Sequence, residues 1–337
     1  MSGVDLASKT LGGSVVAASD ESFGFKERLI DPAEPAFVPG TYDLRGEVVD
    51  GWETRRHAGP GGDWAIVRLG VAGLVRAVDV DTRSFAGNSP SGCHVEGAVL
   101  DATSDPAAPD VRWTLLVKPT VLKPDSHNVF AVDNPRRFTH LRLRLASDGG
   151  VARLRVYGDV VCDPELWADV TIEVSGIEHG GRVEWSSDSF YSDACALIAP
   201  DRPRNMGDGW ETRRRRDIGP DSHDAVMISF AVPADLQRLE IDTCYFVFNA
   251  TPEVAVYGSR ERPDGEHGWA RVPFDVPVLA RTRIAADNRR VFIVDVRDVT
   301  ALRVQAYPDG GIARVRAFGR PTPAGMERMR ALWDAAS

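Results

Sequence analysis

Apolar and polar residues alternate over residues 139–145 and again over 152–158. A period of two places every second side chain on the same face of a β-strand. The two stretches flank the Asp-Gly-Gly of residues 148–150, a composition typical of a tight turn. The pattern predicts a β-hairpin with one face in water, and we expect most of its arginines to be solvated on that face.

The same layout returns near the C-terminus, where an Asp-Gly-Gly at 309–311 separates two alternating stretches. A heptamer, Asp-Gly-Trp-Glu-Thr-Arg-Arg, occurs at residues 50–56 and again, unchanged, at 208–214. An identical heptamer within two similar layouts indicates an internal duplication. We therefore expect two domains, residues 20–160 and 186–320, joined by a connecting segment.

Short strand-like runs separated by Gly, Pro and Asp predict an all-β fold, with a β-sandwich or jelly roll for each unit. The C-terminal stretch 323–337 is the exception. There Met326, Met329, Leu332 and Trp333 fall on one helical face, which predicts a short helix that packs on the body or on another subunit.

Composition narrows the functional classes. The chain has 337 residues, 43% of them hydrophobic and 26% charged, as in globular proteins of two domains. A net charge of −9 offers no field that attracts nucleic acid or an anionic membrane, and no run of apolar residues is long enough to span one. The four cysteines form no Cys-x-x-Cys pair, so we expect a reduced, cytoplasmic protein.

The heptamer admits a structural and a functional interpretation. Asp-Gly is a turn signal, and an adjacent Trp often closes the end of a sandwich core. Discoidin-like and carbohydrate-binding sandwiches carry a comparable Asp-Gly and Thr before a Trp-containing strand that ends on Leu-Gly, as residues 50–54 and 64–70 do here. The charged residues favour function, since arginine can hold a carboxylate while Asp, Glu and His can transfer protons. These candidates are Glu53, Arg55, Arg56 and Asp63 in the first unit and Glu211, Arg213, Arg214, His223 and Asp224 in the second.

Other chemistries find less support in the sequence. No Gly-x-Ser-x-Gly elbow, nucleotide-binding loop or His-Glu-x-x-His spacing occurs. Of the seven histidines, His127 and His223 lie in polar loops and are the better candidates for an acid–base or metal-binding role. No cofactor is certain, and a divalent metal remains an open alternative because Asp and His are available near both motifs.

The doubled heptamer, the strand of residues 63–70 and the segment from Val80 to Asn88 resemble the allantoicase family over about residues 20–320. The resemblance implies tandem jelly-roll units that form a homo-oligomer. It also implies a hydrolase that converts allantoate to ureidoglycolate and urea in purine (allantoin) degradation.

Allantoate carries a carboxylate and two ureido groups on one carbon. The resemblance implies that Arg55, Arg56, Arg213 or Arg214 holds the carboxylate. Proton transfer to the leaving nitrogen and from water falls to Glu53, Asp63, Glu211, His223 or Asp224. Further candidates for substrate contact are Asp81, Thr82, Asn88 and His127.

The two units depart from the family pattern differently. Gly62 replaces a histidine in the first unit, whereas Ala225 replaces a tryptophan and Phe248 a glycine in the second. This divergence favours one active site per chain, in the region of Asp81, Thr82 and Asn88, and leaves a site between the units as the alternative.

The competing function is a non-catalytic pair of carbohydrate-binding sandwiches. It rests on the generic turn and strand layout of each unit. The motif loops offer charge and few aromatic residues, whereas sugar-binding loops usually display aromatic rings.

Overall fold

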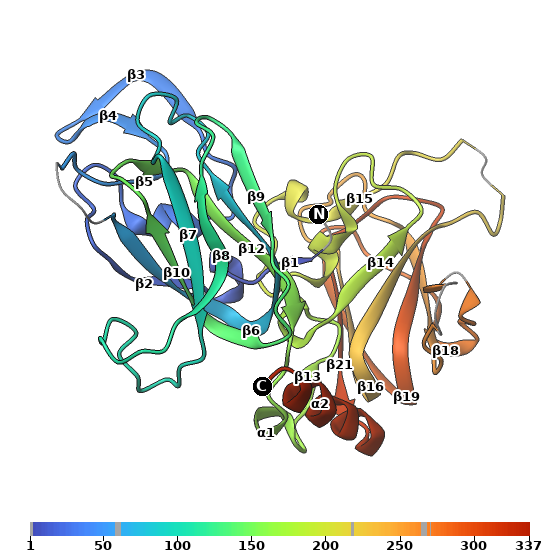
Figure 1. Ribbon diagram of the computed structural model, residues 1–337. Coiled ribbons are helices and arrows are strands. Elements are labelled where there is room, and N and C mark those ends of the chain that lie inside the picture. Colours follow the sequence, from blue (N-terminus) through green and yellow to red (C-terminus); the bar gives the residue numbers. More distant parts are fainter. Residues whose placement is uncertain (1–2, 58–61, 217–218, 264–267, 270) are drawn as a thin grey trace. The chain divides into compact units, whose positions relative to one another are not determined.

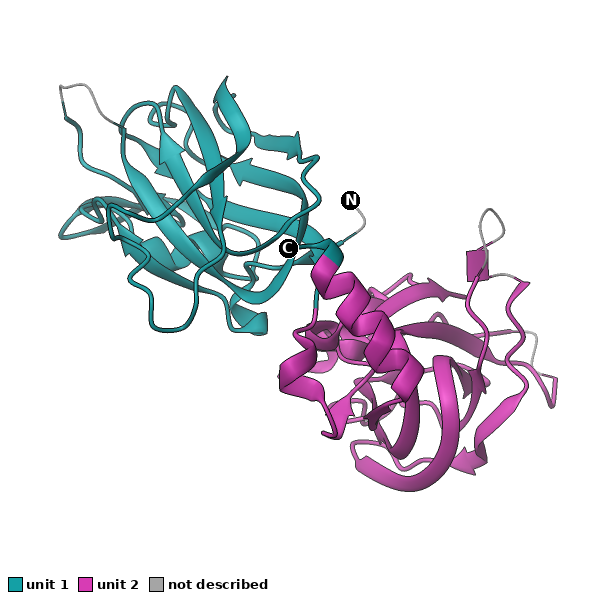
Figure 2. Cartoon of the chain, turned by 60° about the horizontal axis from the view of Figure 1, so that its bottom comes forward, with its two compact units in different colours: residues 1–161, 335–337 teal, residues 162–334 magenta. Residues whose placement is uncertain are grey.

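The computed structural model describes residues 3–57, 62–216, 219–263, 268–269 and 271–337 (Figure 1). The chain divides into two compact units, residues 1–161 with 335–337 (unit 1) and residues 162–334 (unit 2) (Figure 2). Strands dominate both units, which confirms the predicted all-β tandem architecture. Among the described residues, no helix is long and apolar enough to cross a membrane.

Unit 1 is built around one long strand. Its strands are β1 (Val4–Asp5), β2 (Ser14–Ala18), β3 (Phe37–Asp43), β4 (Gly46–Val49), β5 (Trp52–Glu53), β6 (Trp64–Asp81), β7 (Gly92–Ala98), β8 (Thr114–Val121), β9 (His127–Ala131), β10 (Arg137–Leu145), β11 (Gly150–Val151) and β12 (Arg153–Val160). Two 3₁₀ turns, η1 (Lys9–Leu11) and η2 (Lys26–Ile30), lie between the early strands.

Strand β6 takes part in two different sets of pairings. Its first half lies between β2 and β10, and its second half lies between β12 and β9. The register with β10 shifts between Phe138 and His140, where the two sets meet. Buried residues such as Val67, Leu69 and Val78 place β6 in the core of the unit.

The predicted hairpin is wrong, because β10 and β12 each pair with β6 and not with each other. The segment between them instead carries β11 across to the heptamer, where Gly150 faces Glu53 in antiparallel pairing. A period of two fixes the face of a residue but not the partner of its strand. The prediction that its arginines are solvated also fails for β12, because Arg153 and Arg155 are buried.

Unit 2 repeats this arrangement around β16. Its elements are α1 (Pro164–Trp167), β13 (Ile172–Glu173), η3 (Ile177–His179), β14 (Arg182–Ser186), η4 (Ala194–Ile198), η5 (Met206–Asp208), β15 (Trp210–Glu211), β16 (Asp224–Asp242), β17 (Glu253–Ser259), β18 (Val276–Arg283), β19 (Arg289–Tyr307), β20 (Gly311–Ile312), β21 (Arg314–Pro321) and α2 (Pro323–Ala335). Strand β16 pairs with β14, β19 and β21, and β15 pairs with β20 as β5 does with β11.

Helix α2 confirms the predicted C-terminal helix. Met326 and Met329 are buried and pack against Val232 of unit 2. Leu332, which the sequence places on the same apolar face, is 46% exposed. The packed part of the helix is therefore its first half.

A buried arginine fixes the start of the heptamer in each unit. Arg153 donates from Nε to the carbonyl of Ala33 at 2.9 Å, and its other nitrogens reach the carbonyl and carboxylate of Asp50. In unit 2, Arg314 donates to the carbonyls of Asp201 and Asp208 and pairs with the Asp201 carboxylate at 2.8 Å. Both side chains are 98% or more covered, so these oxygens replace water entirely.

Replacing Arg153 with Met should destabilise unit 1 by about 1.5–3 kcal/mol, because the Asp50 carbonyl loses its donor and the Asp50 carboxylate loses its ion pair, keeping the Ala36 N–H as a donor. Urea denaturation measures the change in the free energy of unfolding, and scanning calorimetry provides a second measurement. Arg76→Met is the control, since Arg76 pairs with Asp159 at the surface and such pairs contribute about 0–1 kcal/mol. Equal losses for the two variants would contradict a central role for Arg153.

Candidate functional site

Within the heptamer, Trp and Thr are structural. The Trp52 side chain is fully buried and its indole N–H donates to the carbonyl of Asp20 at 2.8 Å. The Thr54 hydroxyl accepts a hydrogen bond from the N–H of Gly149 at 3.1 Å. Trp210 and Thr212 make the matching bonds in unit 2. These contacts hold the loop and leave the glutamate and the arginines to interact elsewhere.

A glutamate and an asparagine meet in each unit. Asn88 Nδ2 donates to Glu53 Oε1 at 2.7 Å, and Asn249 Nδ2 donates to Glu211 Oε1 at the same distance. The Asn88 carbonyl also accepts from the N–H of Gly150 at 2.8 Å. Gly150 must be glycine, because a Cβ there would lie 2.0 Å from the ring of Phe85. The close packing of glycine and phenylalanine thus brings Asn88 to the heptamer.

In unit 1 this pair lies in a pocket of about 800 Å³, which we call the unit 1 pocket. It is lined by Phe23, Glu53, Thr54, Arg56, His57, Gly87, Asn88, Ser89, Ser91, Ser147, Asp148 and Gly149. Burial raises the pKa of the half-buried Glu53, while the Asn88 hydrogen bond and the charge of Arg56 oppose that rise. Glu53 therefore holds a proton at a higher pH than an exposed glutamate does.

His57 also lines the unit 1 pocket, although it is not among the site residues predicted from the sequence. Its Nε2 lies 3.1 Å from Asp63 Oδ2, and the Ser19 hydroxyl donates to the other carboxylate oxygen at 2.8 Å. A carboxylate beside Nε2 favours a proton on that nitrogen and leaves Nδ1 as the acceptor. The signal in the sequence is the spacing of His57 six residues before Asp63, which has no counterpart in unit 2.

The equivalent pocket of unit 2, of about 440 Å³, is the unit 2 pocket. Its lining residues are Tyr191, Glu211, Thr212, Arg214, Arg216, Phe248, Asn249, Ala250, Pro252, Pro308, Asp309 and Gly310. Arg215 takes the place of His57 and pairs with Asp224 at 2.7 Å, while Ser187 donates to Asp224 as Ser19 does to Asp63. A guanidinium stays protonated and cannot serve as a base.

The paired arginines of the heptamer point to different partners. Arg55 pairs with Asp20 at 3.0 Å and Arg213 pairs with Asp188 at 2.7 Å. Arg56 lines the unit 1 pocket, and Arg214 lines the unit 2 pocket. In unit 1 the second arginine, Arg56, is therefore the one placed to meet a ligand. In unit 2 both arginines also line a neighbouring cavity of about 540 Å³.

Four other candidate residues make contacts outside the lining of these pockets. Asp81 is buried and pairs with Arg83 at 2.7 Å, and the Thr82 hydroxyl donates to the Lys123 carbonyl. His127 contacts the buried Asp79. His223 contacts the Asp221 carbonyl and lies 5.1 Å from the ring of Tyr307, centroid to centroid.

In the described part of the chain, no three His, Cys, Asp or Glu side chains lie close enough together to hold a metal ion.

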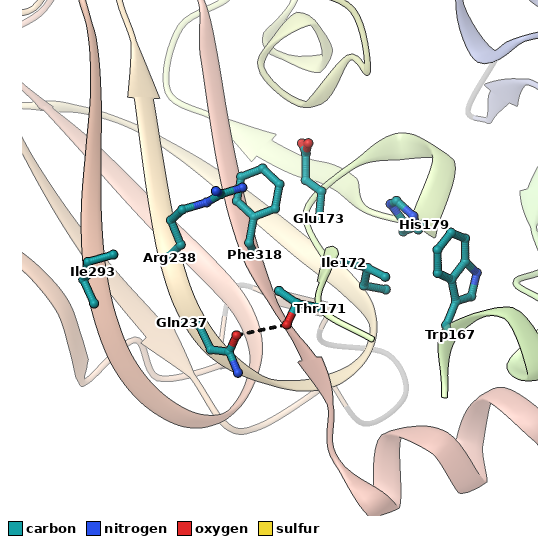
Figure 3. A pocket seen from close by; sticks show the side chains of 9 residues that line it. All are labelled: Trp167, Thr171, Ile172, Glu173, His179, Gln237, Arg238, Ile293 and Phe318. Carbon is teal, nitrogen blue, oxygen red and sulfur yellow. Dashed lines mark hydrogen bonds between the residues drawn. The ribbon is translucent and has the colours of Figure 1, made fainter. Parts of the chain in front are cut away.

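A further cavity of about 590 Å³ lies in unit 2 (Figure 3). Its walls include Trp167, Ile172 and Phe318, and the guanidinium of Arg238 lies 3.8 Å from the Phe318 ring centroid. No heptamer residue reaches it, so it is separate from the unit 2 pocket.

The fold and the two pockets define a tandem β-sandwich protein with an acid–amide pair in each unit. A family model described as Allantoicase repeat matches residues 4–161 and 172–322. A probable allantoicase of Streptomyces coelicolor is 43% identical over 342 residues, covering 97% of this chain and 88% of that protein. The crystal structure of allantoicase from Saccharomyces cerevisiae matches with a TM-score of 0.76 and 29% identity, covering 94% and 92% of the two chains. The chain belongs to the allantoicase family, as the resemblance implied.

Replacing Asn88 with Ala should raise the pKa of Glu53 further, because the lost hydrogen bond favours the ionised carboxylate. Carbon-13 NMR of labelled glutamate carboxyl groups follows the titration, and Glu53→Gln identifies the signal. Ser91→Ala is the control, because Ser91 lines the same pocket without a bond to Glu53. A Glu53 pKa that Asn88→Ala leaves unchanged or lowers would contradict this account of the site.

Proposed function

We propose that the unit 1 pocket hydrolyses allantoate to ureidoglycolate and urea. Family membership supports the reaction. We choose the unit 1 pocket because Glu53, Arg56 and His57 line the same cavity. Together they offer an acid of raised pKa, a fixed cation and an imidazole oriented by Asp63.

Arg56 binds the carboxylate of allantoate. Its guanidinium supplies two parallel N–H donors that match the two carboxylate oxygens. Asn88 fixes Glu53 by a hydrogen bond to one carboxyl oxygen, so the second carboxyl oxygen of Glu53 is left for the substrate. The ureido group that leaves then lies next to Glu53.

The reaction breaks the bond between the central carbon and one ureido nitrogen and forms a bond to the oxygen of water. Glu53 gives its proton to the leaving nitrogen, which departs as urea. His57 takes a proton from water at Nδ1 while Asp63 stabilises the imidazolium at Nε2. Proton transfer from His57 back to Glu53 completes the cycle, so that one water is consumed for each urea released.

The carbohydrate-binding alternative is not favoured. Relatives that are 41–43% identical to this chain and cover 94–98% of it are named probable allantoicases. The unit 1 pocket also presents charged and hydroxyl side chains with Phe23 as the aromatic residue of its lining. A sugar-binding site would use larger aromatic surfaces.

We further propose that the protein is cytoplasmic and assembles as a homo-oligomer. The free cysteines at positions 93, 162, 195 and 244 support a reducing compartment. Exposed apolar side chains on and next to β3, among them Val38, Tyr42 and Leu44, support assembly, because a second copy would cover them.

Replacing Glu53 with Gln should lower kcat for urea release by about 100- to 10,000-fold, as expected for the loss of a general acid. The matched change Glu211→Gln should leave kcat within about threefold, since no histidine lines the unit 2 pocket among the described residues. A colorimetric urea assay measures both variants. Equal losses would overturn the assignment to unit 1 and favour a site that needs both glutamates.

Replacing Arg56 with Met should raise KM for allantoate by about tenfold or more, because a hydrogen bond to a charged group contributes about 1.5–3 kcal/mol. Arg55→Met is the matched control from the same heptamer. Arg55 is directed to Asp20, so its loss should change KM little. Steady-state kinetics compares the two, and a larger effect at Arg55 would exclude the carboxylate-binding role of Arg56.

A further inference from the structure

The unit 2 pocket keeps the frame of the unit 1 pocket but changes its chemistry. The pair of Glu211 and Asn249 retains its 2.7 Å hydrogen bond, so one glutamate oxygen still faces ligands as an acceptor of N–H groups. Arg215 replaces the imidazole, and its bond to Asp224 removes the base that hydrolysis requires. The pocket is therefore equipped to bind and not to react.

The positive charge of this pocket exceeds that of its counterpart. Arg214 and Arg216 both line the cavity of about 440 Å³, where the unit 1 pocket has Arg56. Within the described part of the chain, neither guanidinium has an ion-pair partner of the kind that Arg213 and Arg215 have. An organic anion would neutralise them.

Two aromatic rings complete the lining. Phe248 is 98% exposed and occupies the position of Gly87 in unit 1, and Tyr191 is 62% exposed and occupies that of Phe23. The Phe248 ring is not buried by its own chain, whereas stacking on a flat ligand would bury it. This aromatic surface is absent at Gly87.

We propose that the unit 2 pocket is a second, non-catalytic binding site for a flat organic anion that carries N–H donors on its edge. The arginines hold the negative group, Glu211 accepts the N–H groups, and Phe248 with Tyr191 covers the flat face. A cyclic ureide with a carboxylate has all three features. That this second site is non-catalytic rests on the proposed hydrolysis of allantoate in unit 1, whereas the binding itself does not.

Isothermal titration of the full-length protein with orotate tests the proposal, because orotate is a planar cyclic ureide with a carboxylate. We expect one orotate per chain. Phe248→Leu keeps the apolar volume but loses the flat ring, and should weaken binding by about tenfold or more, in line with aromatic stacking on a base. Arg216→Met should weaken it as well, while urea release stays unchanged in both variants.

Dihydroorotate is the matched ligand control, since it keeps the carboxylate and the ureide but has a puckered ring. It should bind the unaltered protein more weakly than orotate, and Phe248→Leu should remove that difference. No orotate binding, or binding that Arg56→Met abolishes and Phe248→Leu does not affect, would overturn the proposal. So would a Phe248→Leu variant that changes subunit association in sedimentation without changing orotate affinity, since the ring would then be a subunit contact.

Discussion

A guanidinium that is shielded from water needs protein oxygens for its N–H groups, and Arg153 and Arg314 meet this need by gathering the loops that precede the two heptamers. Each arginine begins a strand that pairs with the long central strand of its unit. The core of the sandwich and the position of the heptamer are therefore fixed by the same side chain. Trp52 and Trp210 then close the core beside it.

On this common frame the two units hold different groups. Glu53 and Glu211 each receive a hydrogen bond from an asparagine, and Asp63 and Asp224 each receive one from a serine. The residue paired with each aspartate differs, His57 with Asp63 and Arg215 with Asp224, and an imidazole accepts a proton where a guanidinium does not. Our proposal of one reactive and one unreactive pocket on a duplicated backbone rests on this difference.

Much of the fold could be predicted from the sequence. The repeated heptamer and the alternation of apolar residues identified two all-β units, and the face shared by Met326 and Met329 identified the C-terminal helix. The strand partners could not be predicted, since the alternation over 152–158 is the same whether β12 pairs with β10 or with β6. Of the candidate site, Glu53, Arg56 and Asn88 do line one pocket. His57 was not predicted because it lies just outside the repeated motif. Arg55 and Arg56 are the same residue type in the sequence, and only the structure shows which of the two sides of the extended chain faces the pocket.

The hydrogen bond between the backbone of residue 57 and Asp148 has a wider consequence. Arg215 makes the same backbone bond to Asp309, so the main chain has one path at both positions whatever side chain it carries. Substituents at such positions can be exchanged between copies without redesigning the loop. Arg215→His with Phe248→Gly would therefore change two of the side chains that distinguish the second copy to those of the first without altering the course of the main chain. In a duplicated chain, each copy thus records side chains that the shared backbone of the other can accept.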